Sequence, residues 1–357
     1  MTRHAMRMIP GDNFAATPTI GAGYPRALLE FAVAKGADGQ ALLDRAGLCA
    51  ADLSEQDKHV PLVRYAALID AAAELTGEPA IALQFGEAVR MQEISIVGLI
   101  CEACERTTDV GVALNRYAAL VVDDGRAEPA ALLRGVAGAD GVWIEGPSEV
   151  FTNYPKIAEA EFARLVWNAR VMFADTPDFQ TIGWPLEMHF RHAAPAYVHE
   201  HARIFQAPVV FNSRWNAMRI DPAFLALKQP PVNRYVFGVL SERADAMLKR
   251  FKASRTTRGR VETLLMEMLH TGEASMDAIA AKLALSRRTL HRRLKAEGAT
   301  FEQVLDDLRR QLAHDFLAAR KVTVSETAYL LGFSDPAAFS RAFKRWTGES
   351  PSALRRH

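Results

Sequence analysis

Cationic side chains gather in two short segments near the C-terminal end of this 357-residue chain. Residues 287–295 read RRTLHRRLK, and residues 336–346 read PAAFSRAFKRW. The apolar positions are Leu290 and Leu294 in the first segment and Phe339, Phe343 and Trp346 in the second. Residues three and four apart share one face of a helix, so each segment predicts a helix with an apolar back and a cationic front. Such a helix can rest on a protein core and enter the major groove of DNA.

The same local pattern precedes both segments. A short amphipathic helix with a central alanine, Ala280 or Ala328, leads into a tight turn. A serine that can act as the N-cap of the cationic helix follows, at Ser286 or Ser334. Gly332 suits the second turn, because a tight turn often needs a positive φ angle. Both segments therefore predict a helix-turn-helix.

Between the two patterns, residues 301–319 predict one continuous helix. At about 1.5 Å per residue it is roughly 28 Å long. Successive major-groove faces on one side of DNA are about 34 Å apart, so this helix could set the two cationic helices into adjacent grooves. A basic helix can also be a solvated surface. Two of them with matched turns, caps and a connecting helix favour DNA binding.

The charge of the chain is unevenly distributed. Residues 258–357 contain 17 Lys and Arg against 12 Asp and Glu, whereas the rest of the chain contains 26 against 30. A basic end on an acidic body predicts that only the end meets a polyanion. No run of about 18 uncharged apolar residues is present, and residues 1–17 lack the apolar centre of a secretory signal. We therefore expect a cytoplasmic protein without a membrane span.

Residues 331–355 (LGFSDPAAFSRAFKRWTGESPSALR) resemble the signature of the AraC family of bacterial transcription regulators, and the similarity extends over about 261–356. The resemblance implies that both cationic helices read bases in adjacent major grooves. The implied base-reading residues are Arg288, His291 and Arg292 in the first helix and Pro336, Ala337 and Arg341 in the second, with Arg341 the principal reader. The implied phosphate contacts are Ser286, Lys295, Ser334, Lys344 and Arg345. Ala284 departs from the family, which usually has glycine in the first turn, and reading by Pro336 and Ala337 would be apolar or absent.

The rest of the chain predicts an α+β domain. Helical spacing is found in 24–35, 40–46, 62–76, 79–89, 96–106, 110–122, 151–173, 196–205 and 233–253. Strands are expected as a hairpin of 130–136 with 142–145, as a short strand 187–190, and as an antiparallel pair of 208–211 with 217–220. We expect an irregular N-terminus at 1–22, an effector-binding and dimerisation domain at 23–253, a linker at 254–260, and an all-α double helix-turn-helix domain at 261–357.

Residues 96–117 resemble AraC-family members with an arabinose-binding-like N-terminal domain, a class that includes regulators of ornithine catabolism. Aromatic residues near the expected junction of sheet and helix could line an effector pocket, and Arg170 could meet a carboxylate there. The candidates are Trp143, Phe151, Tyr154, Trp167 and Arg170; as an alternative, the aromatic residues are core. Cys101 and Cys104 are expected in the core, with a metal or redox role as the alternative. His189, His192, His199 and His201 are expected to be ordinary surface or capping histidines rather than the alternative, a metal site, so no metal site is predicted.

These patterns predict a sequence-specific transcription regulator controlled by a small-molecule effector. The expected partners are promoter DNA, the effector and a second copy of the chain, with RNA polymerase as a candidate. No catalytic motif is found, so neither an enzyme nor a cofactor is expected. As an alternative, the N-terminal domain only mediates protein association. The apolar stripe Val236, Val239, Leu240, Met247 and Leu248 in 233–253 is our first candidate for the dimer interface, unless it packs on its own domain.

Overall fold

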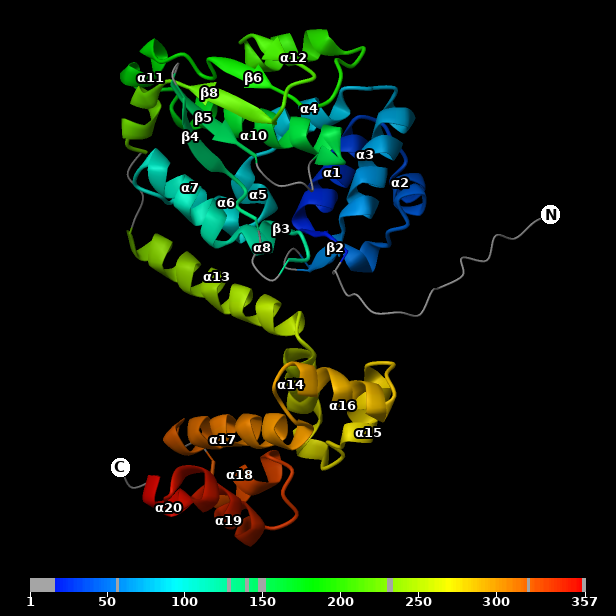
Figure 1. The fold of residues 1–357 in the computed structure, drawn as a ribbon, viewed down its shortest axis with the longest axis vertical. Coiled ribbons are helices and arrows are strands. Elements are labelled where there is room, and N and C mark those ends of the chain that lie inside the picture. Colours follow the sequence, from blue (N-terminus) through cyan, green and yellow to red (C-terminus); the bar gives the residue numbers. More distant parts are fainter. Residues whose placement is uncertain are drawn as a thin grey trace, which may run out of the picture. The chain divides into compact units, whose positions relative to one another are not determined.

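The computed structural model describes residues 17–55, 58–126, 130–138, 141–146, 152–229, 234–319 and 322–354. The chain divides into two compact units, Met1–Leu248 and Lys249–His357. We call them unit 1 and unit 2 and describe each by itself (Figure 1). Unit 1 combines helices with two small sheets, and unit 2 is helical, as the sequence predicts.

The first half of unit 1 is helical around a three-stranded sheet. Its helices are α1 (Gly23–Ala34), α2 (Gly39–Ala46), α3 (Leu62–Thr76), α4 (Ile81–Ala88), α5 (Met91–Ile94), α6 (Ile96–Glu102), α7 (Thr107–Arg116) and α8 (Ala118–Val121). The strands β1 (Thr19–Gly21), β2 (His59–Pro61) and β3 (Val122–Asp123) pair antiparallel in the order β2-β1-β3. The predicted irregular N-terminus is therefore wrong for 19–22, because Ile20 pairs in β1 and is fully buried, as is Ala22. Residues 1–16 lie outside the described residues.

The second half of unit 1 adds a five-stranded sheet and the long helix α10 (Pro155–Met172). The strands β4 (Arg134–Gly138), β5 (Gly141–Glu145), β6 (Glu187–His189), β7 (Val209–Val210) and β8 (Ala217–Ile220) follow the order β4-β5-β8-β6-β7. The predicted hairpin is present, with Val136 opposite Trp143. The predicted pairing of 208–211 with 217–220 is wrong, because β7 lies parallel to β6 and β8 pairs with β5 and β6. Helix α12 (Val198–Phe205) is the crossover that returns the chain to a parallel strand.

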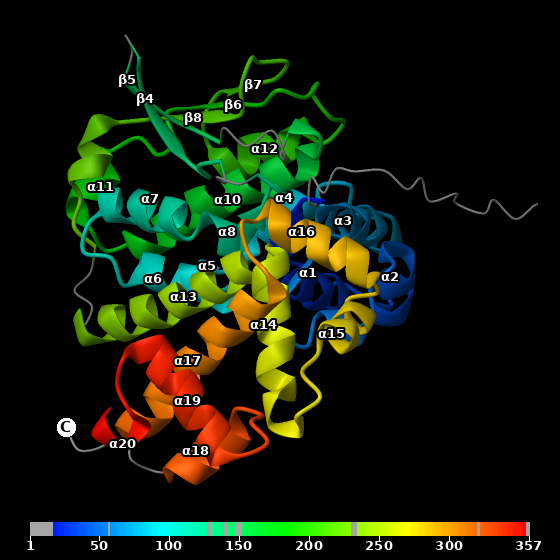
Figure 2. The same ribbon diagram turned by 60° about the horizontal axis from the view of Figure 1, so that its bottom comes forward.

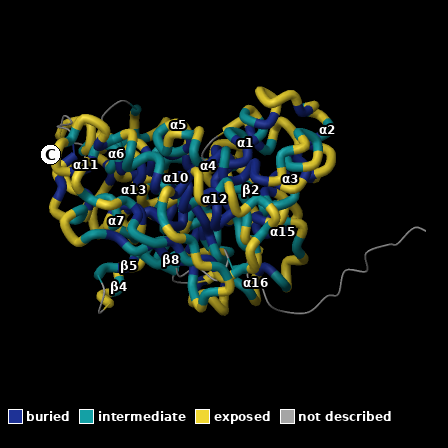
Figure 3. The backbone as a smooth tube through the Cα atoms, turned by 90° about the horizontal axis from the view of Figure 1, so that it is seen from above, coloured by how far each residue is buried: buried dark blue, intermediate teal, exposed yellow. Residues whose placement is uncertain are grey.

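Helix α10 runs through the core of unit 1 and carries buried residues along most of its length (Figure 3). It packs closely on α4, where a Cβ atom added at Gly86 would lie 2.4 Å from the carbonyl oxygen of Ala160. The close approach explains why glycine occupies this helical position despite its cost in helix propensity. Unit 1 also contains α11 (Pro177–Thr181) and most of α13 (Arg234–Ser254).

Unit 2 is built from α14 (Thr257–Met268), α15 (Met276–Lys282), α16 (Arg287–Ala296), α17 (Phe301–Ala319), α18 (Val324–Leu330), α19 (Pro336–Thr347) and α20 (Pro351–Leu354) (Figure 2). One core joins α14, α15, α16 and the first half of α17, and a second joins the other half of α17 with α18 and α19. The predicted linker 254–260 is largely helical, since α13 ends at Ser254 and α14 begins at Thr257. The carboxylate of Glu297 caps α14 by accepting from the backbone N–H groups of Thr257 and Arg258.

Candidate nucleic-acid interface and ligand cavity

Helix α16 has the polarity that DNA recognition requires. Ser286 is its N-cap, and the Ser286 hydroxyl accepts from the backbone N–H of Thr289 at 3.1 Å. Leu290 and Leu294 are buried in the first core of unit 2. The side chains expected at DNA, Arg288, His291, Arg292 and Lys295, are exposed. A capped helix therefore presents a cationic surface while an apolar face holds it.

Helix α19 repeats this arrangement with a different cap. The N-cap is Asp335, whose carboxylate accepts from the backbone N–H of Ala338 at 2.8 Å, and Pro336 occupies the first helical turn. Ser334, expected as the cap, lies one residue earlier and is exposed. A proline in the first turn suits a helix start because its missing N–H is one that the helix would leave unpaired. Phe339 and Phe343 are buried in the second core of unit 2.

The remaining DNA-contact candidates on α19 differ in how they are held. Ala337, Arg341, Lys344 and Arg345 are exposed. Arg345 forms an ion pair with Asp306 on α17, with 2.8 Å between nitrogen and oxygen. In the described part of the chain, Arg341 makes no hydrogen bond or ion pair that would fix its guanidinium. The guanidinium of Arg341 is thus available to a base edge, whereas that of Arg345 would contact DNA while it is paired with Asp306.

The turns of the two helix-turn-helix motifs have the same backbone conformation. Gly332 has a φ of 71° and Ala284, at the matching position, has a φ of 54°. Both values lie in the left-handed region, which alanine adopts only at a cost. A Cβ atom at Gly332 would also lie 2.3 Å from the carbonyl oxygen of Leu269. Glycine is therefore required in the second turn, and the first turn tolerates an exposed alanine under strain.

Arg309 on α17 supports the second turn, a role that its place in the sequence does not predict. Its guanidinium donates to the carbonyl oxygens of Leu331 (2.9 Å) and Gly332 (3.2 Å) in the second turn and lies over the ring of Phe333, 4.5 Å from its centroid. Partial burial lowers the pKa of Arg309 from its ordinary value. The only sequence signal was an arginine within the apolar spacing of 301–319, which does not identify the turn it binds.

A cavity of about 360 Å³ lies in unit 1 between the five-stranded sheet and the helices α5, α6, α7 and α10. Its apolar walls include Leu165, Phe173 and Met218, and Cys101 contributes from α6. Polar lining groups are supplied by Gln92, Glu102, Thr107, Thr108, Asn115, Asn168 and Gln229. Asn168 and Asn115 are already engaged, since their amide oxygens accept from the backbone N–H groups of Met91 and Leu133. The cavity is large enough for a small organic molecule.

The residues expected at an effector pocket lie elsewhere. Trp143 contacts the rings of His189 and Trp215, with centroids 4.7 and 5.1 Å away. Arg170 donates to the backbone carbonyls of Ile204, Trp184 and Phe205, which occupies its guanidinium. Tyr154 packs on the core, Trp167 is half-buried on α10, and Phe151 lies outside the described residues. None of the four described candidates lines the cavity.

The cysteines and histidines also differ in their environments. Cys101 and Cys104 are buried free thiols, as expected of core residues, and burial raises the pKa of Cys104 to about 11. His199 is exposed, as expected. His201 is fully buried against Glu159, which contradicts the expected surface or capping role. The sequence could not show this, because Glu159 is distant along the chain.

Comparison with known proteins gives the class of this chain. The arabinose-binding domain of AraC transcription regulators matches residues 36–229, and a helix-turn-helix domain family matches residues 279–357. The chain therefore belongs to the AraC family of transcription regulators. It is a DNA-binding regulator, and the family is not one of enzymes.

The chain is also similar to individual regulators and to a solved structure. The ornithine utilization regulator of Pseudomonas aeruginosa is 28% identical over 96% of this chain and 98% of its own length. The transcriptional regulator VirS of Mycobacterium tuberculosis is 40% identical over 27% of this chain and 28% of its own length. The crystal structure of the transcriptional regulator CdpR of P. aeruginosa aligns with 98% of this chain and all of its own, at 20% identity and a TM-score of 0.39.

Among the residues that the structure describes, no helix is long and apolar enough to cross a membrane.

Proposed function

We propose that this regulator responds to a small molecule that binds in the cavity of unit 1. The observation that carries the proposal is the cavity itself. Its volume of about 360 Å³ falls in the range of roughly 300–1,000 Å³ that is common for ligand sites. A molecule in it would touch α6, α7, α10 and the sheet together. Binding shifts the population of DNA-bound forms only if the ligand prefers one conformation of the chain.

The lining also suggests the chemistry of the ligand. Glu102 is the one charged residue among those that line the cavity in the described part of the chain. An anionic ligand would lose its hydration there without gaining a cationic partner, which is unfavourable. We therefore expect a largely apolar molecule that carries a neutral polar or cationic group near Glu102 and Gln92.

A thermal-shift screen of the full chain against neutral and amine metabolites tests the proposal. Stabilising compounds are then measured against two variants on the same helix. Ala169→Phe fills the cavity, whereas Val171→Phe changes an exposed position that does not line it. We expect the ligand-induced rise in the unfolding temperature to disappear in Ala169→Phe and to persist in Val171→Phe, because stabilisation follows binding to the folded state. Equal stabilisation of both variants would place the ligand elsewhere.

We propose further that unit 1 carries a homodimer interface on α13. Val236 and Val239 are 42% and 48% exposed, next to Phe237 at 37%. Leu240 and Leu248, which belong to the same expected stripe, instead pack against the core of unit 1. The stripe therefore divides into an inward part and an exposed apolar part that a second copy could cover. A regulator whose unit 1 only associates, without a ligand, is the alternative that this surface favours. RNA polymerase and a cytoplasmic location remain proposals that follow from promoter binding.

A further inference from the structure

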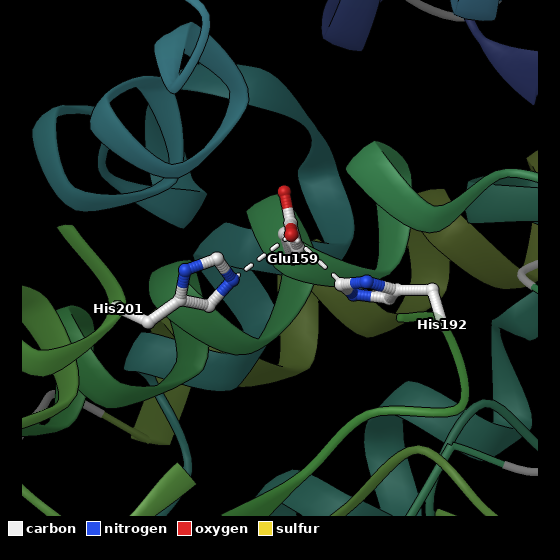
Figure 4. Close-up of side chains that lie close together, drawn as sticks. All are labelled: Glu159, His192 and His201. Carbon is white, nitrogen blue, oxygen red and sulfur yellow. Dashed lines mark hydrogen bonds and ion pairs between the residues drawn. The ribbon is translucent and has the colours of Figure 1, made fainter. Parts of the chain in front are cut away.

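Three ionisable side chains that do not line the cavity meet inside unit 1 (Figure 4). Glu159 projects from α10, His201 from α12, and His192 from the segment after β6. The Nε2 atoms of His201 and His192 lie 2.9 and 3.3 Å from the same oxygen, Oε1 of Glu159. The Glu159 and His201 side chains are 1% and 0% exposed, and the His192 side chain is 15% exposed. The cluster is therefore largely excluded from solvent.

Among the described residues, the hydrogen bonds of the cluster leave two buried nitrogens without a partner, Nδ1 of His201 and Nε2 of His192. The second of these has an unusual contact. Nδ1 of His192 lies 2.9 Å from the carbonyl oxygen of Ala193. A carbonyl can only accept, so Nδ1 carries the proton, and a neutral ring presents a lone pair at Nε2. That buried Nε2 has no hydrogen-bond partner in the described part of the chain and faces a carboxylate oxygen, which is also an acceptor. In these protonation states the contact places two acceptors against each other, and a cation bound by both atoms would resolve it.

The geometry points to a metal ion, and we propose that Glu159, His192 and His201 bind a divalent transition metal, Zn²⁺ in the first instance. Two imidazoles and one carboxylate form a known zinc ligand set that leaves a position for water. With bonds of about 2.0–2.1 Å, the ligand atoms of a tetrahedral site lie roughly 3.3 Å apart. The contact of His192 with Glu159, at 3.3 Å, matches this spacing, and that of His201, at 2.9 Å, is shorter. All three ligand atoms lie within 4.8 Å of one another.

The surrounding groups orient these ligands. The carbonyl of Ala193 fixes the ring of His192 in the form that presents Nε2. The hydroxyl of Tyr197 donates to Oε2 of Glu159 at 3.0 Å, and the Tyr197 ring stacks on His201 with an interplanar angle of 9°. Second-sphere contacts of this kind hold ligands to zinc in place. A bound ion would tie α10, α12 and the segment after β6 together and stabilise unit 1.

Metal titration of the chelator-treated full chain tests the proposal. We expect one equivalent of Zn²⁺ to bind in competition with a chromophoric chelator, and Co²⁺ to give the visible absorption of a tetrahedral site. Glu159→Gln and His192→Ala should weaken binding at least about tenfold, since even second-sphere changes cost about 10–100-fold. His199→Ala is the matched control, because His199 lies on the same helix as His201 but its side chain is 76% exposed. Its affinity should equal that of the wild type.

A second measurement does not depend on any variant folding. X-ray absorption of the Zn²⁺-loaded wild type should show two imidazole nitrogens at about 2.0–2.1 Å. A sulfur shell would place the metal at cysteine and overturn the proposal. Failure of the wild type to bind one equivalent of Zn²⁺ would also overturn the proposal. In the metal titration, an unchanged Zn²⁺ affinity of Glu159→Gln would also overturn the proposal.

Discussion

Replacing Gly332 with Ala tests whether the second helix-turn-helix depends on its glycine. At the φ of 71°, alanine should cost about 1–2 kcal/mol. The added Cβ atom would meet the carbonyl oxygen of Leu269 at 2.3 Å, and forcing such a contact adds about 1–3 kcal/mol. Alanine also lowers the conformational entropy of the unfolded chain, which raises the free energy of unfolding by about 0.4–1 kcal/mol. We expect a net loss of about 1–5 kcal/mol in the free energy of unfolding of unit 2.

Ala284→Gly is the matched substitution in the first turn and should have the opposite sign. Ala284 is exposed at a φ of 54°, so glycine relieves strain without opening a contact. The relieved strain of about 1–2 kcal/mol exceeds the entropic cost of the more flexible unfolded glycine chain, about 0.4–1 kcal/mol. The free energy of unfolding should therefore rise by about 0–1.6 kcal/mol.

Urea unfolding of a fragment spanning 249–357, followed by the fluorescence of Trp346 and by helical circular dichroism, measures both variants. Trp346 reports on the second motif because its ring lies 6.1 Å from that of Phe333, between centroids. Unchanged stability in Gly332→Ala, or an equal loss in both variants, would refute the strain argument.

The other predictions concern DNA contact, assembly and pH. Arg341→Ala should cost about 1–3 kcal/mol and relax specificity at one base pair, whereas Lys344→Ala should weaken all sequences alike; equal losses on specific and non-specific DNA in fluorescence anisotropy would reject Arg341 as a base reader. Val239→Glu should lower the dimer fraction in light scattering, with or without DNA, and a folded variant that stays dimeric would move the interface away from α13. Burial lowers the pKa of His59 to about 4, below its unfolded value of about 6.5. As pH falls between these values, the unfolded chain gains a proton that the folded chain excludes, so unit 1 should lose up to roughly 3 kcal/mol. His59→Gln should flatten this pH dependence in chemical unfolding; an unchanged slope would show that another group sets it.

The helices and the DNA-binding module followed from local patterns. The apolar spacing in 287–295 and 336–346 predicted α16 and α19, because these helices pack on a core through one face. The predicted cap of α19, Ser334, is wrong: Ser334 and Asp335 are both good cap residues, and the preference of proline for the first helical position favours Asp335, which precedes Pro336. The parallel pairing of β6 and β7 was missed because a short strand does not reveal its neighbour.

The candidate sites of unit 1 were harder to predict. The cavity is lined from α5, α6, α7, α10 and the sheet, which are separated along the chain, so aromatic content near one junction did not identify it. Arg170 seemed suited to a carboxylate, but three backbone carbonyls occupy it. No local pattern marks Glu159 as a site residue, because its partners His192 and His201 are distant along the chain and come close only in the fold.

Methylation protection of guanine N7 tests the central claim most directly, because N7 lies in the major groove. The DNA is a site selected from a random pool by the full chain. If α16 and α19 read adjacent major grooves, each bound unit 2 should protect two patches about 10 base pairs apart. Arg288→Ala should weaken protection in one patch and Arg341→Ala in the other. A single protected patch, or loss of the same patch in both variants, would contradict the account.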